Sequence, residues 1–231
     1  MYLRKHIAAA LAIAFFFCVA RGTGAAQDLQ ETLHKLDVAA SNFHTTSADF
    51  QFDSYLTDPI PDKDTQKGTV YYERKGSNFR MAAHIEEVNG KPVPKVYAYA
   101  NGTFQLDEPL IDQVTTFKRA GKFESYVMLG FGASGKALAE KWDITDRGAE
   151  TLDGVKTERL ELVAKDPAIK KSLPKVTIWM DVDRAVSLKQ VFEETDGQSR
   201  VCVYFNIKVN KPLPSDAFKL KTTSKTHFIE R

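Results

Sequence analysis

The spacing of hydrophobic residues changes once, near the start of the chain. From Leu29 to Phe43, apolar residues recur every three or four positions, which predicts an amphipathic helix of about four turns. Asp28 stands where it could cap the start of that helix. From Ala48 onward apolar and polar residues alternate, a pattern typical of strands with one buried face.

Short turn sequences such as Asn89-Gly90 and Asn101-Gly102 separate the alternating segments, and consecutive hairpins indicate an antiparallel sheet. A glycine-broken helical stretch between Lys122 and Trp142 interrupts the series once. We therefore predict a mainly β fold in which an incomplete, curved antiparallel barrel of about ten to eleven strands is covered by two helices. The predicted strands include residues 48–52, 68–74, 78–83, 96–100, 104–106, 114–117, 142–145, 157–164, 176–182, 188–193 and 201–209.

The N-terminus has the pattern of a secretory signal peptide. Arg4 and Lys5 precede an almost wholly apolar run at 7–20, and small residues follow at 24–26. The run of about 14 residues is shorter than the roughly 20 that span a bilayer, although an uncleaved anchor is an alternative. We predict cleavage after residue 26, export, and a single mature domain over residues 27–231.

The charge and the cysteine content limit the partners and the disulfide bonds that this chain can have. The net charge of +2 includes three basic residues of the signal peptide, so the mature chain carries −1. No basic stretch is interleaved with aromatic residues, which argues against nucleic acid as a partner. Cys202 is the only cysteine after Cys18 is removed, so an intramolecular disulfide is excluded. Its place between Val201 and Val203 predicts a packed small hydrophobe.

One motif imitates a nucleotide site. Gly130 to Lys136 contains both G-x-G-x-x-G and G-x-x-x-x-G-K. Ala137 stands where a phosphate loop needs Ser or Thr for magnesium, and the surrounding segments are hairpins. We interpret the segment as a glycine-broken helix or loop. No histidine pair has metal-ligand spacing and no nucleophile motif is present, so we predict neither an enzyme, a metal nor a cofactor.

The apolar faces of the predicted strands lead to a hypothesis about function. Arg74 shares the parity of Val70 and Tyr72, and a charge on an apolar face is costly unless it has a partner. An ordinary filled core is one interpretation. The strands outnumber the helices that could cover them, however, which favours an apolar cavity under a movable cover. The predicted lining residues are Leu33, Leu36, Val70, Tyr72, Phe79, Val96, Val127, Met128, Phe131, Ile178, Met180, Phe192, Val203 and Phe205.

The chain resembles a known family, the periplasmic LolA-like carriers of outer-membrane lipoproteins. The resemblance covers roughly residues 29–223 and rests on the order and spacing of short motifs. These motifs are Asn42-Phe43-His44, Ala48-Asp49-Phe50, the strand from Lys67 to Arg74, Asn78 to Met81, Val96 to Phe104, Tyr126 to Leu129 and Asp216 to Leu220.

The resemblance implies a strongly curved, incomplete β-barrel with a helical lid that Arg74 hydrogen-bonds. It also implies a monomer that ferries lipoprotein acyl chains from an inner-membrane ABC-type exporter to an outer-membrane acceptor. Lys75-Gly76 follows the arginine where family members usually have proline, and Tyr71 and Tyr72 replace a common tryptophan. These departures leave another lipid cargo open, as well as a lipid-sensing or protein-binding scaffold.

Overall fold

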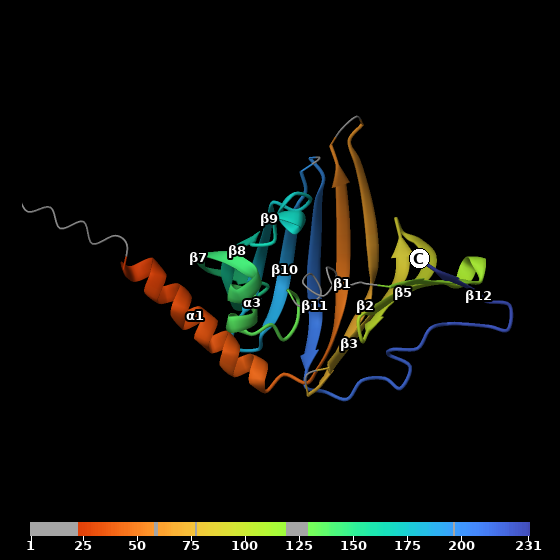
Figure 1. Ribbon diagram of the computed structural model, residues 1–231, viewed down its shortest axis with the longest axis horizontal. Helices are drawn as coiled ribbons and strands as arrows, with labels where there is room; N and C mark the ends of the chain where they lie inside the picture. Colours follow the sequence, from red (N-terminus) through yellow and green to blue (C-terminus); the bar gives the residue numbers. More distant parts are fainter. Residues whose placement is uncertain (1–22, 58–59, 77, 119–128, 196) are drawn as a thin grey trace, which may run out of the picture.

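One large sheet forms the body of the protein (Figure 1). The computed structural model describes residues 23–57, 60–76, 78–118, 129–195 and 197–231. In these residues twelve strands lie in the order β12-β6-β5-β4-β3-β2-β1-β11-β10-β9-β8-β7. Neighbouring strands are antiparallel except for β12 and β6, which are parallel. The strands are β1 (Thr45–Leu56), β2 (Asp62–Lys75), β3 (Asn78–Val88), β4 (Lys91–Ala100), β5 (Thr103–Glu108), β6 (Gln113–Phe117), β7 (Trp142–Leu152), β8 (Val155–Ala164), β9 (Lys175–Asp181), β10 (Val186–Glu193), β11 (Ser199–Val209) and β12 (His227–Glu230).

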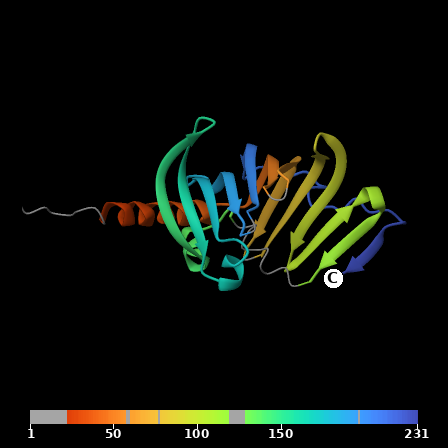
Figure 2. The same ribbon diagram turned by 90° about the horizontal axis from the view of Figure 1, so that it is seen from above.

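The sheet curves without closing, and Figure 2 shows its green-to-teal end and its yellow-green end on opposite sides of the central strands. The predicted fold class, an open antiparallel barrel with helical cover, is confirmed. The described strands number twelve because β12 (His227–Glu230) follows the eleven predicted strands. The polar stretch at 88–94 is a hairpin with a two-residue turn, since Asn89 and Gly90 both adopt positive φ.

Helix α1 (Thr23–Ser41) packs with α3 (Gly135–Lys141) near β7, over one half of the sheet (Figure 1). The predicted apolar stripe is correct, because Leu36, Ala40 and Phe43 join the core. The predicted start near Leu29 is wrong, since the helix extends back to Thr23; of the added residues, Ala25, Ala26 and Gln27 have good helix propensity. The other helices are short: η1 (Pro109–Ile111) and α4 (Pro167–Lys170). Within the described part of the chain, no helix is long and apolar enough to cross a membrane.

Residues 210–226, which we call the C-terminal strap, cross the outer face of the sheet before β12 joins β6. Nε2 of His84 lies 3.0 Å from the carbonyl oxygen of Ala217. The guanidinium of Arg80 lies over the Phe218 ring, 4.0 Å from its centroid. The backbone N–H of Lys221 donates to the buried Asp107 carboxylate. The strap thus buries the outer face of β3 to β5.

Acidification is expected to weaken the strap through His84. Burial lowers the pKa of His84, so the folded protein favours the neutral ring more than the unfolded chain does. As the pH falls below about 6.5, the unfolded state takes up the proton first and the free energy of unfolding decreases. Urea unfolding at about pH 7.5 and about pH 5 measures this loss. His84→Gln keeps a donor for Ala217 and should show a smaller decline; an equal decline in both proteins contradicts the assignment.

Candidate functional site

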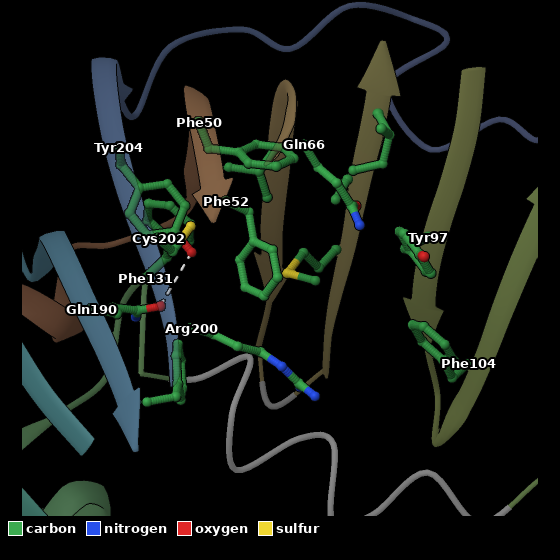
Figure 3. Close-up of a pocket in the computed structure, with 15 residues that line it drawn as sticks. Phe50, Phe52, Gln66, Tyr97, Phe104, Phe131, Gln190, Arg200, Cys202 and Tyr204 are labelled. Carbon is green, nitrogen blue, oxygen red and sulfur yellow. Dashed lines mark hydrogen bonds between the residues drawn. The ribbon is translucent and has the colours of Figure 1, made fainter. Parts of the chain in front are cut away.

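The concave face of the sheet contains an apolar pocket of about 350 Å³ (Figure 3). It exists because α1 and α3 cover the β7 side of the sheet, while inward side chains of the central strands remain uncovered. Most of the lining is aromatic or aliphatic. The lining residues are Phe50, Phe52, Gln66, Val70, Met81, Ala83, Ile85, Tyr97, Phe104, Phe131, Gln190, Phe192, Arg200, Cys202 and Tyr204.

Few polar groups interrupt this lining. The hydroxyl of Tyr204 donates to Oε1 of Gln190 over 3.3 Å, as the dashed line in Figure 3 shows. Arg200 lies at the rim, where it pairs with Glu194 at 3.1 Å. Cys202 is a free, buried cysteine, and burial raises the pKa of its thiol to about 12. The thiol is therefore protonated and packed, as the sequence predicted.

Arg74 on β2 forms hydrogen bonds with three parts of the molecule near the pocket, namely α1, the loop at Gly132 and Tyr72. Its Nη1 donates to the carbonyl of Ala40 in the last turn of α1 over 3.2 Å, and its Nη2 donates to the carbonyl of Gly132 over 2.6 Å. Nε and Nη2 also donate to the Tyr72 hydroxyl. A cation suits the helix C-terminus, where carbonyls lack helical partners. We call this set of contacts the Arg74 latch.

Residues 129–134, which we call the glycine loop, run from the edge of the pocket to α3. Gly132 donates its N–H to Ala185, and Ser187 donates to Gly130, both over 2.8 Å. These bonds hold the loop on the start of β10, while Phe131 reaches the pocket and contacts Tyr204 edge-on at 4.9 Å. The glycine loop thus forms part of the pocket wall.

Close packing accounts for the glycines that imitate a phosphate loop. A Cβ at Gly132 would lie 2.5 Å from the Phe43 ring and 3.1 Å from Nη2 of Arg74, and φ is +66° there. A Cβ at Gly135 would collide with the backbone of Leu33. The N–H of Lys136 donates to Asp37 of α1 over 3.0 Å. The motif therefore brings the loop against α1, in agreement with the loop interpretation.

The predicted lining residues divide into groups. Val70, Phe131 and Phe192 line the pocket. Phe79 stacks between Tyr72 and Tyr99 near the latch, with ring centroids 5.6 and 5.2 Å apart, and does not line it. Val127 and Met128 lie outside the described residues. Five others are buried in the core instead of lining the pocket: Leu33 and Leu36 on α1, Tyr72 on β2, and Ile178 and Met180 on β9.

The prediction is wrong for three residues, because they lie on the outer face of the sheet and cannot line the pocket. Val96 pairs with His84 and is 1% exposed beneath the C-terminal strap. Val203 and Phe205 have the opposite parity to Cys202 and Tyr204 on β11, and Phe205 is 44% exposed. Both faces of β4 and β11 carry apolar residues, so alternation alone could not identify the inner face. The alternation of Phe50 and Phe52 was the available signal for the lining residues that we missed on β1.

Solved structures share this architecture at low sequence identity. An uncharacterized conserved protein from Thermus thermophilus aligns over 89% of this chain and 99% of its own, with TM-score 0.55 and 11% identity. MucB of Pseudomonas aeruginosa aligns over 88% and 66%, with TM-score 0.53 and 13% identity. The Mycobacterium tuberculosis lipoprotein LppX aligns over 82% and 99%, with TM-score 0.50 and 12% identity. No protein-family model and no curated protein matches the sequence.

These likenesses define the class of the fold. The chain has the LolA-like architecture, in which one curved, unclosed antiparallel sheet is covered by helices on its concave side. Identities of 11% to 13% establish the fold and carry no information about the ligand.

Gly132→Ala is expected to detach the glycine loop from the Arg74 latch. The added methyl group collides with Phe43 and strains a positive φ, so the bonds around Gly132 should open more often. Amide hydrogen exchange should report lost protection at Gly132 and Ser187. Gly102→Ala, at a positive φ in open space, is the matched control for backbone strain. Equal protection in both variants would show that the close approach is unimportant.

Proposed function

We propose that this protein is a periplasmic lipid carrier that holds an acyl chain in the concave pocket and moves it between membranes. The pocket itself carries the proposal, because it is apolar, concave and lined by aromatic side chains. Its volume of about 350 Å³ is near the lower end of the range for ligand sites, about 300–1,000 Å³, which suits a single chain. The signal-peptide pattern supports export.

Burial of hydrocarbon supplies the affinity. Each buried CH₂ contributes about 0.8 kcal/mol, so a hidden chain of about fourteen carbons gains roughly 10 kcal/mol before ordering costs. Such a ligand does not dissociate quickly unaided. A carrier therefore needs a second conformation in which the pocket is less favourable for the chain.

The Arg74 latch is our candidate for the element that switches between the two conformations. Its acceptors are backbone carbonyls of α1 and of the glycine loop, so the latch forms only when both segments lie against β2. A chain that displaces Phe131 would open it, and re-formation of the latch would favour release. By resemblance, cargo arrives from an inner-membrane ABC-type exporter and passes to an outer-membrane acceptor.

A protein-binding scaffold on the same fold is the alternative. MucB has been solved in complex with MucA, which makes a protein partner a concrete second possibility. The two functions differ in what fills the pocket. Native mass spectrometry of protein purified from cells separates them, because a carrier retains lipid and a scaffold does not.

Ala83→Phe is expected to abolish co-purification of lipid. Ala83 lines the pocket, so a phenyl ring there occupies the space of the chain, whereas Val203→Phe adds comparable bulk on the outer face of β11. Native mass spectra should show lipid on the wild type and on the Val203 variant only. Lipid retained by a folded Ala83 variant would place the binding site elsewhere, and no lipid on any of the three would favour the scaffold.

Arg74→Leu is expected to keep lipid binding and slow delivery. The substitution removes charge-assisted bonds worth about 1–3 kcal/mol that form only when the latch closes. Bound lipid should then leave about tenfold more slowly in transfer of a fluorescent acyl lipid from donor to acceptor vesicles. Arg80→Leu, on the outer face, is the matched control. Wild-type transfer rates for the Arg74 variant would remove the latch from the mechanism.

A further inference from the structure

One polar atom in the pocket lacks a partner. Nε2 of Gln190 is buried and has no hydrogen-bond partner among the described residues, although Oε1 of the same amide accepts from Tyr204. Gln190 is 3% exposed and lines the pocket. A buried amide donor without a partner is destabilising, whereas an apolar residue of the same shape would leave no donor unpaired. The N–H groups of Gln190 are therefore donors available to a ligand.

The register of the sheet locates this donor along the pocket. Gln190 pairs with Cys202, Cys202 with Phe52 and Phe52 with Gln66, so these four lining residues form one row across the concave face. Two residues from Gln190 along β10, in the direction of the rim, Phe192 pairs with Arg200. Two residues the other way, Tyr204 lies under Phe131 and the glycine loop. Each step is about 7 Å.

The pocket is thus graded along its length. Its inner end is aromatic, and its middle row contains the unpaired amide donor of Gln190 and, two strands beyond Cys202, the amide of Gln66. Its rim carries the cationic Arg200, whose side chain is 46% exposed (Figure 3). A ligand that matches this order has an apolar tail, then a hydrogen-bond acceptor, then a polar head in solvent. An acyl chain joined through an ester or amide carbonyl has that order of groups.

We propose that Gln190 recognises the carbonyl oxygen of an acyl chain and so distinguishes acyl from alkyl ligands. The inference rests on the proposed lipid-binding function and deepens it. Nε2 donates to the carbonyl, the chain extends inward toward Phe131, and the head group leaves past Arg200. Gln190 is thus a specificity-determining residue that touches the ligand.

Matched lipids test this proposal. The probes are 1-palmitoyl lysophosphatidylcholine and its 1-O-hexadecyl ether analogue, which differ in the carbonyl. Wild-type protein should bind the ester about tenfold more tightly, the value of one hydrogen bond from a desolvated donor. Gln190→Met keeps the length of the side chain and should lose that preference, with ether affinity unchanged. A palmitoyl chain amide-linked to a short peptide should also bind in preference to the ether; its affinity relative to the ester assigns the cargo to acylated proteins or glycerolipids.

The control is the same exchange on the outer face. The amide of Gln105 donates to Thr116, so Gln105→Met should leave both dissociation constants unchanged. Equal wild-type affinity for ester and ether overturns the role of Gln190 while leaving lipid binding intact, as expected if only water meets Nε2. Failure of every lipid to bind overturns the proposed function itself. The wild-type comparison decides the matter even if the Gln190 variant does not fold.

Discussion

The chain has more sheet than its helices can cover, and the rest of the structure follows from this mismatch. Twelve described strands form one curved sheet, yet α1 and α3 pack mainly over its β7 side. Elsewhere on the sheet, apolar side chains on either face must be covered by another part of the chain or remain exposed as a binding surface. On the outer face of β3 to β5 the C-terminal strap covers them. On the inner face they remain as the wall of a pocket.

The latch and the pocket share one wall. Phe131 contributes to the pocket, and the next residue, Gly132, accepts from Arg74. Movement of the glycine loop therefore alters the shape of the cavity and the hydrogen bonding of Arg74 together. Since Arg74 also binds the end of α1, the leading helix is linked to the same motion. Under the proposed function, this arrangement would couple occupancy of the pocket to the position of the glycine loop and α1 without a separate signalling element.

The local sequence pattern predicted the helices and strands well. It predicted less well which face of each strand points into the pocket. The 3.6-residue period of α1 and the two-residue period of the strands identified the fold class, because each reflects burial on one side of an element. The parity of Val70, Tyr72 and Arg74 placed all three on one face, which the structure shows to be the inner face. Parity failed at Val96 and Val203, where both faces are apolar. The strap that buries Val96 comes from more than a hundred residues away, and no local period records such a contact.

The central pairing of the sheet joins distant parts of the chain. Strand β1 pairs with β11, so Thr46 lies opposite Val209, and the meander β1 to β6 meets the meander β7 to β11 only there. Such non-local pairing slows folding, because a long loop must close before the contact forms. During synthesis, the first half presents β1 as an open edge until β11 emerges. The order of the strands therefore leaves the β1 edge without its second neighbour until nearly the whole chain has been made.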